Sequence, residues 1–168
     1  MFSLGMVQVN AQTEKTTLTF NFPQVLPGER TYLSILLSNS GQDTVSRLEH
    51  WFEIPTRKLS YGRARQGIAA DMAGAVLTVE ETLQEEDTLI LHLSHQGRQP
   101  IPDGAVVEIR LDVADIEPQT LILPYRVEAF GEQGERIPDV EFSDARLHVS
   151  LQPLGVPEIV FSCFFYMH

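Results

Sequence analysis

Apolar side chains occupy every second position over most of the chain, and this period of two constrains the fold more than any other feature. Within 105–113, every second residue from Val107 to Val113 is aliphatic, and the residues between them are charged. Because successive side chains of a strand point to opposite faces, such a segment has one buried and one solvent-exposed face. The same alternation predicts strands at 16–22, 31–38, 46–54, 75–82, 88–95, 119–130 and 146–151. Only 63–72 is compatible with a short helix, which its Gly67 disfavours.

Proline and glycine separate these segments at close to regular intervals. Pro27-Gly28 fits the two central positions of a type II turn, and Asp103-Gly104 has turn chemistry just before the strand at 105–113. Pro55 has no N–H group and therefore belongs at the end or edge of a strand. Eight or nine short strands, each with one solvent-exposed face, predict an all-β fold in which antiparallel sheets pack face to face as a β-sandwich.

Composition excludes several classes of protein. The 168 residues include 12 Lys and Arg against 23 Asp and Glu, which gives a net charge of −11. This charge argues against a nucleic-acid-binding protein and against a protein that binds the membrane surface through a polybasic segment. No apolar run reaches the roughly 18 residues of a membrane-spanning helix, so we expect no membrane span. The single cysteine, Cys163, permits neither an intrachain disulfide nor a cysteine-rich zinc site.

The two ends differ from the rest of the chain. Residues 1–15 begin with an uncharged stretch that reads either as the remnant of a secretion signal or as a disordered N-terminus. Residues 16–152 form the predicted sandwich. Residues 153–168 comprise a Pro- and Gly-containing linker and an apolar tail, Ile159–Met167, which is either one more buried strand or an adhesive segment.

Three motifs together resemble cohesin domains and their relatives in the carbohydrate-binding-module superfamily. They are Leu26-Pro27-Gly28-Glu29 before a strand, Phe52-Glu53-Ile54-Pro55 with Leu59 four residues on, and Pro102-Asp103-Gly104 leading into the strand at 105–113. The sequence departs from the family pattern at Leu111, where phenylalanine is usual, and at Ile54-Pro55, which lacks an intervening aspartate. The resemblance covers about Thr16–Gln152 and concerns structural positions.

The resemblance implies a nine-stranded jelly-roll sandwich that binds and does not catalyse. Cohesins bind dockerin modules through one exposed sheet face and so attach enzymes to a scaffold, while their sandwich relatives bind polysaccharides. The resemblance therefore also implies an extracellular or cell-surface location for this domain.

Residues for catalysis or metal binding do not form a recognisable pattern. No Gly-x-Ser-x-Gly elbow accompanies the five histidines, and Cys163 lies in an apolar run that suppresses thiolate formation. His92 and His95 are three apart on a predicted strand and so point to opposite faces, which indicates surface histidines. His50 alternates in phase with Leu48 and Phe52 and is expected to be partly buried and hydrogen-bonded. The acidic residues of 80–87 and the segment 138–144 lack a calcium-loop pattern, so we expect no metal, no cofactor and no enzyme activity.

A binding face, if the domain has one, is expected on the outer side of the strand at 46–54. Trp51 is out of phase with its buried neighbours and points away from the core together with Arg47 and Glu49, and Tyr32 is out of phase in the same way on its own strand. One tryptophan and scattered tyrosines make a poor platform for stacking sugars. The only basic cluster, within Arg57–Arg65, is either a site for an acidic partner or a solvated loop.

The sequence thus predicts a non-catalytic, cohesin-like module that attaches to a protein partner of the dockerin type. The alternatives are a polysaccharide-binding module involved in polysaccharide catabolism and a structural spacer in a larger secreted assembly. A dockerin partner predicts calcium-dependent binding, whereas a polysaccharide partner predicts retardation on polysaccharide gels that depends on Trp51.

Overall fold

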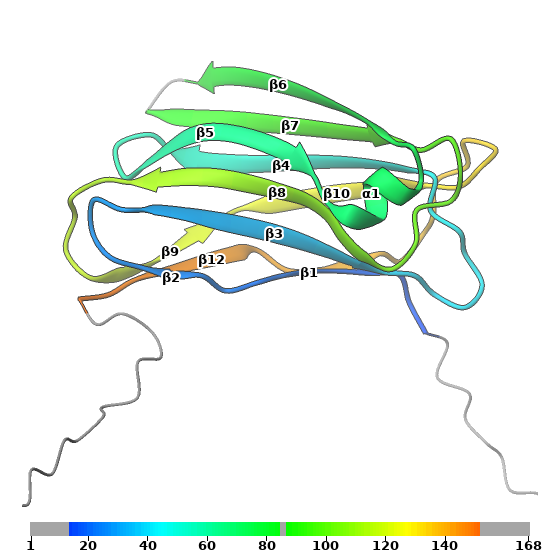
Figure 1. Ribbon diagram of the computed structural model, residues 1–168, viewed down its shortest axis with the longest axis horizontal. Helices are drawn as coiled ribbons and strands as arrows, with labels where there is room; N and C mark the ends of the chain where they lie inside the picture. Colours follow the sequence, from blue (N-terminus) through cyan, green and yellow to red (C-terminus); the bar gives the residue numbers. More distant parts are fainter. Residues whose placement is uncertain (1–13, 85–86, 152–168) are drawn as a thin grey trace, which may run out of the picture.

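The computed structural model describes residues 14–84 and 87–151, and over these residues the chain is an all-β sandwich with one short helix (Figure 1). The expectations for residues 1–13 and for the tail with Cys163 lie outside the described part. The elements are β1 (Thr17–Phe20), β2 (Gln24–Val25), β3 (Arg30–Ser38), β4 (Arg47–Pro55), β5 (Leu59–Gln66), α1 (Ile68–Met72), β6 (Val76–Gln84), β7 (Thr88–Gln96), β8 (Gly104–Val113), β9 (Gln119–Leu123), β10 (Tyr125–Phe130), β11 (Glu141–Phe142) and β12 (Ala145–Val149). No described helix is long and apolar enough to cross a membrane.

Two large sheets form the layers of the sandwich. One has the strand order β11-β1-β3-β8-β5, and the other has the order β10-β4-β7-β6. All pairs within them are antiparallel except the short contact of β1 with β11, so the predicted antiparallel arrangement is confirmed for the long strands. The predicted turn at Pro27-Gly28 is supported by a φ of 76° at Gly28, and Pro55 ends β4 as expected.

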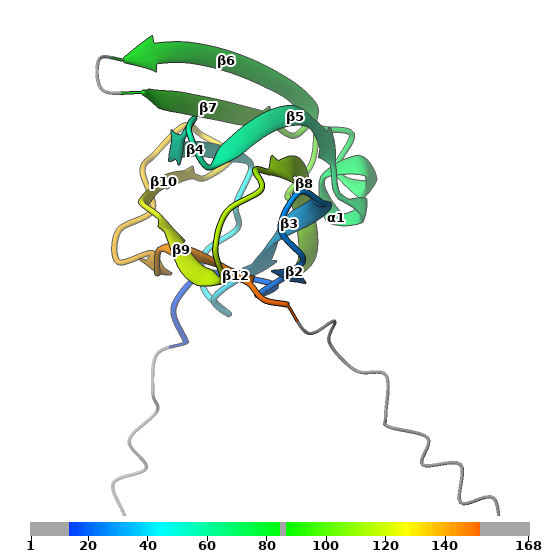
Figure 2. The ribbon, with the colours of Figure 1, turned by 90° about the vertical axis from the view of Figure 1, so that its left-hand side faces the viewer.

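A small third sheet, β2-β12-β9, links the edges of the two layers (Figure 2). β2 follows β1 from the five-stranded layer, whereas β9 runs through Pro124 into β10 of the four-stranded layer. The segment 119–130 is therefore two strands in two sheets and not the single strand that its alternation suggests. This division, together with the two-residue strands β2 and β11, brings the described strands to twelve where nine were expected.

The core lies between the layers and consists of the alternating apolar residues. In β8 the aliphatic set from Val107 to Val113 is buried, as predicted, and in β4 the buried set includes Leu48, Phe52 and Ile54. The rings of Phe20, Phe52 and Tyr125 contact one another, with ring centroids 4.7 to 6.0 Å apart. This burial of one face of β3, β4, β7 and β8 fixes which of their residues point outward.

The segment from Leu59 to Gln66 is a strand that the sequence analysis did not predict. β5 pairs with β8, and a register shift between Tyr61 and Arg63 interrupts its alternation, which hides the period of two. The helix predicted within 63–72 exists, but it is only the five residues of α1. Gly67 precedes α1 instead of lying inside it, and its lack of a side chain is required because a Cβ there would overlap the Ala105 carbonyl.

Two histidines lie in the core. His50 is fully buried, and its Nδ1 is 2.7 Å from the hydroxyl of Tyr125, which confirms the expected burial and hydrogen bond.

His95 does point away from His92, but it is fully buried too, so its assignment to the surface is wrong. The phase of β7 explains this, because His95 continues the inward series of Leu91 and Leu93. Neither ring nitrogen of His95 has a hydrogen-bond partner among the described residues.

These buried rings predict a protein that loses stability in mild acid. Burial lowers the pKa of His95 to about 4, and burial with the adjacent His95 and His92 lowers the pKa of His50 well below 6.5. Unfolding restores the ordinary pKa, so protons bind the unfolded chain more tightly than the folded one. The free energy of unfolding is therefore unaffected by the titration of these histidines above about pH 6.5, and it falls as the pH drops toward the folded-state pKa. Between pH 7.5 and pH 5, His95 alone should account for a loss of roughly 2 kcal/mol.

The measurement is urea unfolding at both pH values. His95→Leu should narrow the difference in unfolding free energy between pH 7.5 and pH 5, because it removes the imidazole that takes up a proton on unfolding. His148→Gln, at an exposed position on β12, is the matched control and should leave the difference unchanged. Equal pH dependence in the wild type and His95→Leu would contradict the prediction.

Candidate functional site

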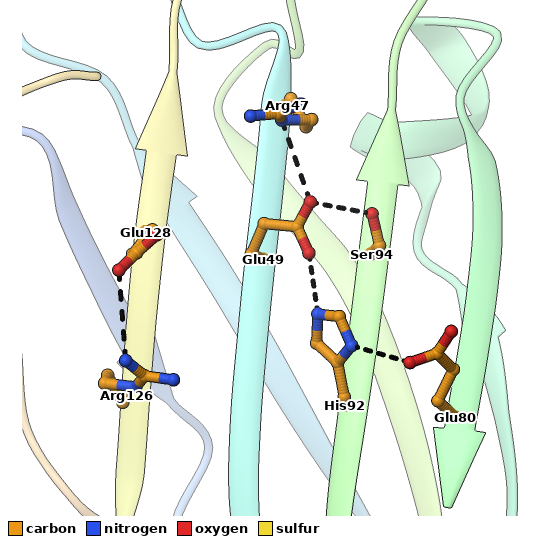
Figure 3. Close-up of polar contacts among 7 residues, drawn as sticks. All are labelled: Arg47, Glu49, Glu80, His92, Ser94, Arg126 and Glu128. Carbon is orange, nitrogen blue, oxygen red and sulfur yellow. Dashed lines mark hydrogen bonds and ion pairs between the residues drawn. The ribbon is translucent and has the colours of Figure 1, made fainter.

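The outer face of the four-stranded sheet carries an ordered set of polar and aromatic side chains (Figure 3). Strand register arranges them in rows across the sheet. One row pairs Arg126 of β10 with Trp51 of β4, and Trp51 with His92 of β7, which in turn pairs with Glu80 of β6. The sequence analysis placed Trp51 on the outer side, and the structure agrees.

Trp51 stands between two flat side chains. The guanidinium carbon of Arg126 lies 4.0 Å from the centre of the indole ring, and the ring of His92 stacks on it at 4.8 Å with an angle of 4°. Since β10 and β7 flank β4 on opposite sides, Arg126 and His92 cover opposite faces of the indole. A sugar would have to displace one of them to stack on this ring.

Glu49 connects the rows. Its Oε2 is 2.6 Å from Nε2 of His92, and its Oε1 accepts a hydrogen bond from the Ser94 hydroxyl at 3.1 Å. The same Oε1 lies 3.7 Å from Nε of Arg47. Nδ1 of His92 faces Glu80 at 3.3 Å, so the imidazole lies between two carboxylates (Figure 3). This network fixes the orientation of the His92 ring against Trp51.

The β10 side of the face is basic and aromatic at its surface. Arg47 lies over the ring of Phe130 at 3.9 Å, and Glu128 lies 3.9 Å from Arg126 and 3.6 Å from Arg136. Each cation therefore has a carboxylate or a ring beside it. Charged and aromatic groups of this kind, held in place but open to solvent, suit recognition of another macromolecule.

A shallow hollow of about 320 Å³ adjoins Trp51. Ile90 and Gln84 line it on the side of the β6–β7 hairpin, and Pro124 and Arg126 line it on the β10 side. It has room for one partner side chain placed beside the indole. We find no layer of helices or strands over this face in the described part of the chain (Figure 2).

Not every predicted site residue is here. Arg47, Glu49 and Trp51 share the face, but Tyr32 does not, because it lies on β3 in the other layer, where it is exposed. The sequence analysis did not assign His92, Glu80 or Arg126 to the face, although the alternation of β7 already placed His92 opposite the core.

The basic cluster does not form one patch. Lys58 lies in the turn before β5 and hydrogen-bonds Gln119 at 2.9 Å. Arg57 pairs with Asp87 near the β6–β7 turn, and Arg65 pairs with Glu108 at 2.5 Å. The reading as a solvated loop therefore fails for Arg63 and Arg65, which are part of β5.

The geometry of the face supports binding. Among the described residues, no three His, Cys, Asp or Glu side chains come together as a metal site. Glu49 is held by His92, Ser94 and Arg47, and the hollow beside Trp51 has a volume of about 320 Å³.

Comparison with solved structures identifies the fold. The OlpA cohesin of Clostridium thermocellum, from a type I cohesin–dockerin complex, superposes with a TM-score of 0.69 at 10% sequence identity, covering 82% of this chain and all of that one. The chain has the cohesin fold. The predicted resemblance to cohesin domains is thereby confirmed at the level of the fold.

Other cohesins agree. The third cohesin of ScaC from Acetivibrio cellulolyticus, in complex with the ScaB dockerin, gives a TM-score of 0.67 at 13% identity over 80% of this chain and 98% of that one. A non-cellulosomal cohesin from the archaeon Archaeoglobus fulgidus gives 0.64 at 14% identity over 82% and 92%. The sequence matches no protein-family model and none of the curated proteins.

The Glu49 network makes a prediction about stability. Glu49→Ala should lower the free energy of unfolding by about 1–2 kcal/mol, because a partly buried carboxylate loses its hydrogen bonds to His92 and Ser94. Glu53→Ala is the matched control: it is the same change on the same face of the same strand, at an exposed position. It should change stability by less than about 0.5 kcal/mol. Denaturant unfolding at pH 7.5 measures both, and equal effects would contradict the prediction.

Proposed function

We propose that this domain is a non-catalytic attachment module that holds a protein partner of the dockerin type on the outer face of its four-stranded sheet. The single observation that carries the proposal is Trp51, clamped between Arg126 and His92 at the centre of a sheet face that no other described layer covers. Tryptophan and arginine held in this way are the residues that most often dominate the free energy of a protein interface.

The fold supports the choice of partner. Two of the solved cohesins described above come from complexes with dockerins, so a cohesin-fold domain is suited to hold such a module. An extracellular or cell-surface location is part of the same proposal, since attachment of enzymes to a scaffold acts outside the cell. The net charge of −11 favours a partner with a positively charged binding surface.

The structure gives less support to the alternative of polysaccharide binding. Such modules stack sugar rings on exposed aromatic faces, and both faces of the only tryptophan are covered. The exposed Tyr32 lies on the opposite layer and cannot extend a platform from Trp51. A purely structural spacer would not need the ordered network around Glu49.

A binding experiment on matched variants tests the proposal. In calcium, a panel of purified dockerin modules should include one that binds the domain, and Trp51→Ala should weaken that binding at least about 30-fold, or about 2 kcal/mol, because a central anchor is lost. Tyr32→Ala removes an exposed aromatic from the opposite layer and should have no effect. Isothermal titration calorimetry measures both affinities, and melting temperatures show that each variant is folded.

Calcium dependence shows which of the two partners in the complex needs the metal. A chelator should abolish binding because the dockerin holds the calcium, and it should leave the melting temperature of the isolated domain unchanged. Retardation on a polysaccharide gel that depends on Trp51, without binding to any dockerin, would replace the proposal with a glycan-binding function. Loss of dockerin binding in Tyr32→Ala would place the interface on the other layer.

A further inference from the structure

β6 is an open edge of the four-stranded sheet. Among the described strands it pairs only with β7, and it stands away from the body of the sandwich (Figure 2). Every residue of β6 except Leu77 is exposed. A sheet edge of this length presents a row of unpaired N–H and C=O groups, which is a template for another strand.

One hydrogen bond shows which backbone groups of β6 point outward. The N–H of Leu77 donates to the side-chain oxygen of Gln66, on β5, at 3.0 Å, so Leu77 faces away from β7. In an antiparallel strand the N–H and C=O of one residue point the same way, and the direction alternates along the strand. The pairing of β6 with β7 runs without a bulge, so Val79, Glu81 and Leu83 also direct their N–H and C=O groups to the open edge.

The side chains beside this edge are sorted by face. Val79 and Leu83 lie on the inner side of the sheet, opposite Leu93 and Leu89 of β7, yet they are 37% and 71% exposed. The opposing layer therefore does not cover them. Glu80 lies on the outer side, where it meets His92. Glu81 lies between Val79 and Leu83 on the same inner side, opposite Leu91. A strand added here would contact Val79, Glu81 and Leu83 on one face and Glu80 on the other.

The charge around the edge determines what kind of strand fits. Residues 67–97 contain no lysine or arginine but six acidic residues: Asp71, Glu80, Glu81, Glu85, Glu86 and Asp87. The arginines of the neighbouring turn and strand are partly neutralised, since Arg57 pairs with Asp87 and Arg65 with Glu108. A second copy of this chain would bring the same acidic residues to the edge, and like charges on paired strands repel one another.

We propose that the β6 edge binds an extended basic segment of a partner protein as an added strand. Alternate residues of that segment are Lys or Arg on the side of Glu80, and aliphatic on the side of Val79 and Leu83. The backbone groups of Val79, Glu81 and Leu83 supply the hydrogen bonds, and the side chains supply specificity. This edge adjoins the Trp51 face, and Glu80 belongs to both, so a dockerin-type partner and an extended segment would use neighbouring surfaces.

A labelled nine-residue peptide tests the proposal, with lysine at its first, fifth and ninth positions, valine at the even positions and threonine at the third and seventh. Fluorescence anisotropy should show binding to the full chain that weakens with added salt. A peptide with glutamate in place of each lysine should bind at least tenfold more weakly. Val79→Pro should weaken binding at least tenfold, because it removes an edge-facing N–H and leaves the bonds to β7 in place.

A charge reversal provides the second variant. Glu80→Lys should weaken binding several-fold, whereas Glu117→Lys, the same change at an exposed loop position, should not. Amide hydrogen exchange gives a readout that charge alone cannot produce: bound peptide should slow exchange at Val79, Glu81 and Leu83 and leave the already bonded Thr78 and Thr82 unchanged. Melting temperatures check that each variant is folded.

Three outcomes would overturn the proposal. The first is no binding of the basic peptide at millimolar concentration. The second is equal binding of the basic and acidic peptides, or binding without protection of the three edge amides. The third is concentration-dependent protection of those amides without any peptide, which would show that a second copy of the chain occupies the edge.

Discussion

The burial of one side of β3, β4, β7 and β8 is the constraint from which the other features follow. Because side chains alternate along a strand, placing Leu48, Phe52 and Ile54 in the core leaves Glu49 and Trp51 no direction but outward. A shift of one residue in the pairing of β4 would exchange the two sets and bury a charge. The core thus holds the outer face in register, and the rows across that face have the geometry of the sheet beneath them.

The layers and the phase of most strands were predictable from the sequence, because alternation reports directly on burial. Alternation does not report burial where it is interrupted or where it continues across a change of sheet. A register shift at Tyr61–Arg63 hid β5, and Pro124 divided a continuous apolar pattern between two sheets. His95 was misassigned because a histidine was presumed to prefer water, although the phase of its own strand directs it into the core.

From the sequence, residues of a single strand could be assigned to the same face, but residues of different strands could not be assigned to one site. Trp51 and Glu49 could be placed on one face from β4 alone, but Arg126 and His92 come from strands about 75 and 40 residues further along the chain, and only the pairing register brings them to the indole. Tyr32 shows the converse: it has the right phase on its own strand but lies in the wrong sheet. Phase is local information, whereas sheet membership depends on the whole topology.

The acidic character of the β6 edge also resolves a difficulty of the fold. An exposed edge strand that carries Val79 and Leu83 would be prone to pair with the same strand of a second copy of the chain. A two-fold antiparallel pairing centred on Glu80 would bring that carboxylate against its own copy and Val79 against Glu81, so both charge and apolar matching oppose it. The charges that discourage self-association remain favourable toward a basic strand. A single feature of the sequence therefore both protects the open edge and selects what can close it.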